Sequence, residues 1–102
     1  AYLATFYSNL AIVYADKDDF QQALAYDQKA YDIRKRVLGT YSKDMAITYI
    51  SLAEDYLHFN RNDEAKECII KAEEICKVIF ENEDNELYQN VIHAKHVLGI
   101  LD

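Results

Sequence analysis

The sequence aligns with itself when it is shifted by 42 residues. The shift pairs apolar or small residues at helical spacing: Ala4 with Ala46, Tyr7 with Tyr49, Leu10 with Leu52, Ala11 with Ala53, Tyr14 with Tyr56, Ala23 with Ala65, Ala30 with Ala72 and Ile33 with Ile75. A period in this range is typical of solenoids, in which one structural unit is stacked on the next. The chain is therefore expected to consist of repeated units that pack in the same way.

Each unit is predicted to be a pair of helices. The 102 residues include no proline and two glycines, fewer turn formers than an all-β domain needs. Phe6, Leu10, Val13 and Tyr14 lie on one stripe of helical period. The predicted helices cover residues 2–16, 20–38, 43–59, 63–80 and 86–101.

Turn-forming and capping residues indicate where these helices begin and end. Asp19 followed by Gln22 resembles a capping box at the start of the second helix. Gly39 is expected to end that helix in the left-handed conformation, and Ser42 is expected to cap the third. The fourth helix is expected to start at Asn60 or Asn62.

Small residues recur at fixed places in both units. Ala11 and Ala23 would allow the two helices of a pair to approach closely, and Ala30 would admit the first helix of the next pair. Binary patterning alone would tolerate leucine at any of these positions. Repeated alanine therefore predicts repeated close contact between helices.

Charge and cysteine content exclude several classes of protein. A formal net charge of -7 argues against binding to nucleic-acid phosphates and against adsorption to an anionic membrane. Cys68 and Cys76 fall eight residues apart in one predicted helix, about 12 Å, which is too far for a mutual disulfide. Free thiols, no signal peptide and no apolar run of membrane-spanning length favour a cytoplasmic location. Because the first residue is Ala1, the chain is expected to be an excerpt of a longer one.

The recurring residues resemble the tetratricopeptide repeat. The pattern of Leu-small, Tyr, Ala and Ala stands as Leu10-Ala11, Tyr14, Ala23, Ala30, and again as Leu52-Ala53, Tyr56, Ala65, Ala72. The 42-residue period and the segments SNLAIVY, ALAYDQKAYDIRKRVLG and DMAITYISLAEDY are similar to the long repeats of kinesin light chains.

The resemblance implies an all-α fold, a right-handed α-solenoid of about five antiparallel helices. Residues 1–102 would form one array fragment: repeat one at about 4–41, repeat two at about 46–83, and a partial third repeat or capping helix at about 86–101. The sequence departs from the family at Asp27 and Ile69, where an aromatic residue is usual. The last helix fits a third repeat only after an insertion of about four residues, which puts Leu98-Gly99 at the Leu-small position.

The resemblance also implies that the first helix of each repeat lines a concave groove that binds a peptide. The residues that it places there are Thr5, Ser8, Asn9, Ile12, Asp16, Ile47, Ile50, Ser51, Glu54 and His58, with His93, His96 and Ile100 from the last helix.

Asn9 is the most specific of these positions, because the family often uses this asparagine to bond a ligand's backbone. An amide side chain offers both a donor and an acceptor to an extended peptide, and Ser51 occupies the equivalent place in repeat two. The carboxylate clamp of co-chaperones needs Lys and Asn where this chain has Ser8 and Ile12, so chaperone tails are not expected. The mixture of apolar and acidic groove residues favours an apolar or basic partner segment.

Metal binding and catalysis are not predicted. His93 and His96 lie three residues apart on one helix face, as metal ligands can, and His58 is a candidate third ligand. No carboxylate or cysteine is clearly placed to complete such a site. The sequence contains no P-loop or nucleophile elbow. We therefore expect no cofactor, no metal and no enzyme activity.

The expected function is a protein-interaction scaffold. The alternative is a peptide-sensing regulatory module that controls an attached output domain. The last helix is apolar on most sides, which predicts that the parent chain continues past Asp102 or that two copies self-associate through this helix. Its apolar residues are Val91, Ile92, Val97, Leu98, Ile100 and Leu101.

Overall fold

The computed structural model describes residues 2–82 and 85–100. This part of the chain contains five α-helices and no strand. The helices are α1 (Tyr2–Asp16), α2 (Phe20–Leu38), α3 (Lys43–His58), α4 (Asn62–Ile79) and α5 (Glu86–Leu98).

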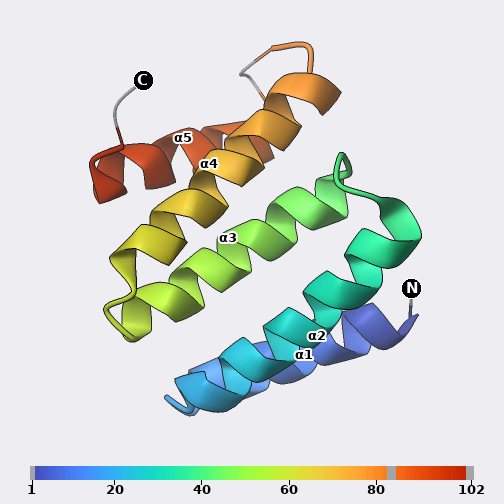
Figure 1. Ribbon diagram of the computed structural model, residues 1–102, viewed down its shortest axis with the longest axis vertical. Helices are drawn as coiled ribbons and strands as arrows, with labels where there is room; N and C mark the ends of the chain where they lie inside the picture. Colours follow the sequence, from blue (N-terminus) through green and yellow to red (C-terminus); the bar gives the residue numbers. More distant parts are fainter. Residues whose placement is uncertain (1, 83–84, 101–102) are drawn as a thin grey trace.

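Each helix packs mainly against the helices that precede and follow it in the chain. Figure 1 shows this order, with α1 and α2 at one end of the molecule, α3 and α4 in the middle and α5 at the other end. Stacking of neighbour on neighbour is the arrangement of a repeat solenoid. The predicted all-α solenoid fold is therefore confirmed. None of the described helices is long and apolar enough to cross a membrane.

The residues predicted to start α2 and α3 do so. Asp19 Oδ1 accepts a hydrogen bond of 3.3 Å from the backbone N–H of Gln22, and Ser42 Oγ accepts one of 3.2 Å from Met45. Gly39 follows α2 with a φ of 77°, a conformation that glycine adopts without steric cost.

Of the two residues predicted to start the fourth helix, Asn62 is the first residue of α4. Asn60 lies in the preceding turn in a left-handed conformation with a φ of 57°, and Arg61 stands at the cap position. The predicted end of the last helix needs correction. The last helix ends at Leu98 and does not run to residue 101. Gly99 takes the left-handed conformation, and the Ile100 N–H donates to the Lys95 carbonyl, which closes the helix.

The recurring alanines lie where the helices meet. Ala23, Ala30, Ala65 and Ala72 have no exposed surface, and Ala53 is 2% exposed. A leucine at such a position would force neighbouring helices apart, which typically costs about 1–3 kcal/mol. The predicted close contacts between helices are confirmed.

The centre of the hydrophobic core lies between α3 and α4, with α5 covering one side. Met45, Ile69, Ile75 and Val91 are among the largest fully buried side chains. Cys68 and Cys76 are unpaired and buried in the same cluster, as expected of packing residues. Burial raises the pKa of the Cys68 thiol to about 11, so this side chain stays in its neutral form.

The apolar stripe predicted for the first helix is only half correct. Phe6 and Val13 are 55% and 46% exposed, because α1 packs mainly on α2 and no described element covers its outer side. The contact with α2 is partly aromatic: the Tyr26 ring stacks on Tyr7 and Tyr14, with ring centroids 5.7 and 5.6 Å apart. The α1 end of the array therefore exposes several large apolar side chains.

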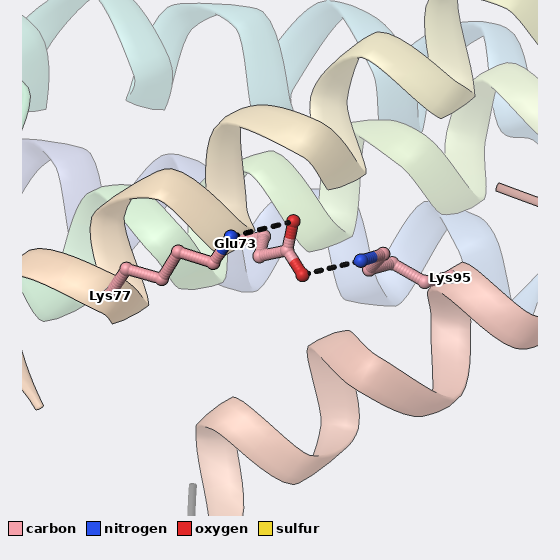
Figure 2. A network of polar contacts seen from close by, with 3 residues as sticks. All are labelled: Glu73, Lys77 and Lys95. Atoms are coloured by element: carbon pink, nitrogen blue, oxygen red, sulfur yellow. Dashed lines mark hydrogen bonds and ion pairs between the residues drawn. The ribbon is translucent and has the colours of Figure 1, made fainter. Parts of the chain in front are cut away.

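The last helix is less completely buried than its apolar sequence suggests. Val91 is fully buried against α4, but Val97 is 68% exposed, and Leu101 lies outside the described residues. Lys95, which is 7% exposed, donates a 2.6 Å hydrogen bond to Glu73 on α4. Figure 2 shows Lys95 and Lys77 on the two oxygens of the Glu73 carboxylate. An ion pair therefore contributes to the α4–α5 interface.

Candidate binding groove

Two hollows lie along the first helices of the units and meet at α3. The α1–α3 hollow has a volume of about 160 Å³ and is lined by Ser8, Ala11, Ile12, Ala15, Asp27, Arg34, Ile47, Ser51, Glu54 and Asp55. The α3–α5 hollow has a volume of about 430 Å³ and is lined by Lys43, Ile47, Ile50, Ser51, Asn85, Glu86, Leu87 and Asn90. Ile47 and Ser51 line both, so the two hollows form a row across the molecule.

Six of the thirteen predicted groove residues line this row. They are Ser8, Ile12, Ile47, Ile50, Ser51 and Glu54. All lie on α1 or α3. These six residues therefore share one surface of the array.

The other predicted groove residues lie apart from the two hollows. Thr5 lines a smaller hollow of about 90 Å³ between α1 and the end of α2. Asn9, Asp16, His93 and His96 are exposed and line neither groove hollow. Ile100, which follows α5, packs against the hydrophobic core instead.

His58 is held at the end of α3 by a ring contact. Its imidazole stacks on Phe20 of α2, with the ring centroids 3.5 Å apart and the planes 10° from parallel. No group of three His, Cys, Asp or Glu residues that could hold a metal ion occurs in the described parts of the chain. His58 therefore serves as a packing contact between α2 and α3.

Two buried aspartates in the floor of the α1–α3 hollow were not predicted as site residues. Asp27 on α2 is 6% exposed, and Asp55 on α3 is 4% exposed. A hydrogen bond joins their carboxyl groups. Burial, together with this bond and the charge of Asp27, raises the pKa of Asp55 to about 8. The pair therefore retains a proton at neutral pH.

The pKa of Asp27 is also raised, chiefly by burial. The hydrogen bond from Asp55 and the positive charge of Arg34 act in the opposite direction. Arg34 Nη1 donates a 2.9 Å hydrogen bond to Thr48 Oγ1 across the α2–α3 interface. The two aspartates behave as one acid pair that shares a proton.

One feature of the sequence pointed to this pair. Asp27 stands where the tetratricopeptide pattern usually has an aromatic residue, four positions after Ala23. A carboxylate at an apolar position of a repeat needs a partner when it is buried. The sequence alone did not identify Asp55 as that partner, because the two residues lie on different helices.

A separate hollow of about 380 Å³ lies on the side of the second helices. Its lining residues come from α2, α3 and α4 and include Gln28, Tyr31, Asp32, Tyr56 and Glu67. It shares no residue with the row of hollows along α1, α3 and α5. The molecule therefore offers two distinct surfaces whose roles can be compared by experiment.

Comparison with known families identifies the fold independently of its geometry. The profile of the tetratricopeptide repeat family matches residues 2–77, a segment that contains α1, α2, α3 and most of α4. No curated protein matches the sequence. Repeats of this kind generally mediate protein–protein interactions and are not catalytic themselves. Because the match covers most of the chain and the helices stack as such repeats do, the chain belongs to the tetratricopeptide repeat family.

Proposed function

We propose that the chain is an interaction scaffold that holds an extended segment of another protein in the row of hollows along α1, α3 and α5. The observation that carries this proposal is the continuity of the row, since Ile47 and Ser51 of α3 belong to both hollows. A segment that crossed α3 would contact three helices of the array at once. This function requires binding of the segment and no catalytic residues.

The character of the surface supports a peptide ligand. Ile12 and Ile47 are 59% and 39% exposed beside the α1–α3 hollow, so apolar side chains of a partner can bury them. Ser8 and Ser51 offer hydroxyl groups at the same place. Apolar contacts with a few polar groups are the usual composition of a site that binds an extended segment.

The experiment compares the two faces of the array. Twelve-residue peptides displayed on phage are selected against the protein, and the affinities of the enriched peptides are measured by fluorescence anisotropy. Ser51→Phe puts a large ring into the row of hollows and should weaken binding at least about tenfold, which corresponds to about 1.4 kcal/mol. Circular dichroism checks that the variant is folded.

Gln28→Phe is the matched control, because Gln28 is exposed and lines the hollow on the other face. It should leave the affinity unchanged. Loss of binding in Gln28→Phe together with normal binding in Ser51→Phe would move the site to the side of the second helices. Enrichment of no peptide would contradict the proposed function itself.

Asn9 tests the finer analogy with the family. Asn9 is exposed on α1 and does not line the α1–α3 hollow. It would therefore contact a ligand only where the ligand extends beyond this hollow onto α1. If it bonds the ligand backbone, Asn9→Ala should weaken the selected peptides about five- to tenfold, because one hydrogen bond contributes about 1 kcal/mol. Unchanged affinity would remove Asn9 from the site.

The remaining features of the proposal concern the setting of the array. The 42-residue period supports a repeat of the kinesin-light-chain kind, and the two unpaired thiols support a cytoplasmic location. The alternative function, a peptide-sensing regulatory module, uses the same groove. It differs from the scaffold because the array is attached to an output domain that it controls. Self-association through α5 predicts that the apparent mass rises with concentration in analytical ultracentrifugation.

A further inference from the structure

The floor of the α1–α3 hollow has an unusual composition for a repeat interface. Two acidic side chains, Asp27 and Asp55, meet there with less than a tenth of their surface exposed. Both belong to the lining of the hollow and are not sealed inside the core. Burial of two carboxyl groups side by side costs free energy that a pair of apolar residues would not cost. Packing between α2 and α3 alone therefore gives no reason for this pair.

One oxygen of the pair has no partner. Asp55 Oδ2 is buried and accepts no hydrogen bond, and it is the one such side-chain atom within residues 2–82 and 85–100. Buried acceptors are satisfied in the great majority of cases, so an exception calls for an explanation. Asp55 belongs to the lining of the hollow, so a turn of its buried side chain would bring this oxygen to a donor that enters the hollow.

The charges around the hollow favour a positive donor. The acidic groups there are Asp27, Asp55 and, at the exposed rim, Glu54. Arg34 is the basic residue of the lining, and its guanidinium already donates to Thr48.

The flanking helices add little to oppose a cation. From α1 the lining receives Ser8, Ala11, Ile12 and Ala15, none of which is titratable. His58 of α3 is the basic group that acts on Asp55, and its ring is stacked on Phe20. The acceptors of the hollow therefore outnumber the cations that could neutralise them.

We propose that the α1–α3 hollow is a subsite for one lysine side chain of the partner segment, whose ammonium group binds between Asp27 and Asp55. This assignment rests on the proposed function, since it specifies part of the ligand of the same groove. The four-carbon stem passes between the exposed side chains of Ile12 and Ile47. The ammonium is a compact charge with three donors, which suits a narrow hollow of about 160 Å³ better than the planar fork of arginine.

Binding of the ammonium has a consequence for protons. In the free protein the two carboxyl groups share a proton that Asp55 donates to Asp27. A lysine ammonium takes over the role of that proton, so the proton leaves to solvent and both carboxylates are ionised around the new cation. Lysine binding near neutral pH should therefore release up to one proton.

The test uses a peptide selected on the wild-type protein, in which each position in turn is replaced by lysine, arginine, norleucine or glutamate. At one position the lysine peptide should bind at least tenfold more tightly than the norleucine peptide, which has a similar stem and no charge. Asp27→Asn combined with Asp55→Asn should remove this preference, so that the lysine and norleucine peptides bind with similar affinity. Asp32→Asn, the same change at an exposed site on α2 outside this hollow, should retain it.

A second measurement does not depend on the folding of a variant. Calorimetry of the wild-type protein in two buffers of different ionisation enthalpy counts the protons released, and lysine should release more than norleucine. Equal affinity of all four peptides at every position overturns the lysine subsite while groove binding stands. A preference for arginine over lysine also overturns it, and absence of any bound peptide overturns the proposed function together with the subsite.

Discussion

At the scale of single residues, the acid pair makes stability depend on pH. The ordinary pKa of an aspartate in an unfolded chain is about 3.9, whereas that of Asp55 in the folded protein is raised to about 8. The folded state therefore holds a proton that the unfolded state releases. The stabilising effect of this proton is complete below about pH 4 and is lost as the pH rises through about 8.

Asp55→Asn should remove this dependence, because asparagine cannot ionise and can still donate to Asp27. Relative to the wild-type protein, the variant should gain about 3–4 kcal/mol of unfolding free energy between pH 5 and pH 8, because the slope is about 1.4 kcal/mol per pH unit. Urea unfolding at a series of pH values measures the difference. For the control Asp32→Asn, at an exposed position, the plot of unfolding free energy against pH should run parallel to that of the wild type. A parallel plot for Asp55→Asn would mean that Asp55 is already ionised at neutral pH.

At the scale of helices, the α2–α3 and α4–α5 interfaces differ in the pair of side chains that meets at one corresponding position. Tyr31 of α2 and Tyr49 of α3 meet through their hydroxyl groups, 3.3 Å apart. In the next interface Glu73 of α4 meets Lys95 of α5. Glu73 follows Tyr31 by 42 residues, but Lys95 follows Tyr49 by 46. The pairing is what an insertion of one helical turn before α5 would produce.

The ion pair between α4 and α5 should matter mainly when it is broken. The Glu73 side chain is 15% exposed, and its ion-pair partners in the described chain are Lys95 and Lys77. Lys95→Met would leave the Glu73 carboxylate with Lys77 alone, at 3.7 Å. We expect a loss of about 2 kcal/mol in urea unfolding. The double change Glu73→Gln with Lys95→Met should recover most of it, because no buried charge remains.

Lys77→Met is the control for this interface, since the Lys77 side chain is 62% exposed. Exposed pairs contribute about 0–1 kcal/mol, so this variant should unfold close to the wild type. If Lys95→Met were as stable as Lys77→Met, the α4–α5 interface would depend on apolar contacts around Val91 alone.

Most of the helices could be predicted from the sequence, because the capping residues and the 42-residue repeat indicate the same helix boundaries. Asp19 and Gly39 flank α2 at its observed ends. The prediction was wrong where the two signals competed. The repeat alignment treated Gly99 as a small packing residue, but its local freedom to adopt a positive φ makes it a helix terminator instead. Local conformation prevailed there.

The lining of the candidate groove was predictable only in part, for a related reason. Repeat position placed Ile47 and Ser51 in the groove, since one helix in each pair faces the same way. The contact of Asp27 with Asp55 joins two helices and occurs once, so no repetition in the sequence reveals it. Only the packing of α2 against α3 brings the two carboxyl groups together.

At the scale of the whole molecule, stability should be greatest in the middle of the array. In a solenoid each helix is stabilised by its neighbours, so the terminal helices have fewer stabilising contacts than the central ones. α3 and α4 contain most of the fully buried side chains, whereas α1 buries Ala4 and Ala11 completely and leaves larger apolar groups exposed. Opening α1 therefore exposes little new apolar surface and costs little free energy.

Amide hydrogen exchange should report this gradient residue by residue. We expect the amides in the middle of α1 to exchange at least about tenfold faster than those in the middle of α4, which corresponds to a difference of about 1.4 kcal/mol in opening free energy. A peptide that binds across α1 and α3 should slow α1 selectively, because it stabilises only the closed form. Equal protection of the two helices in the free protein would mean that the array opens as one cooperative unit, and its groove would then be rigid before any partner arrives.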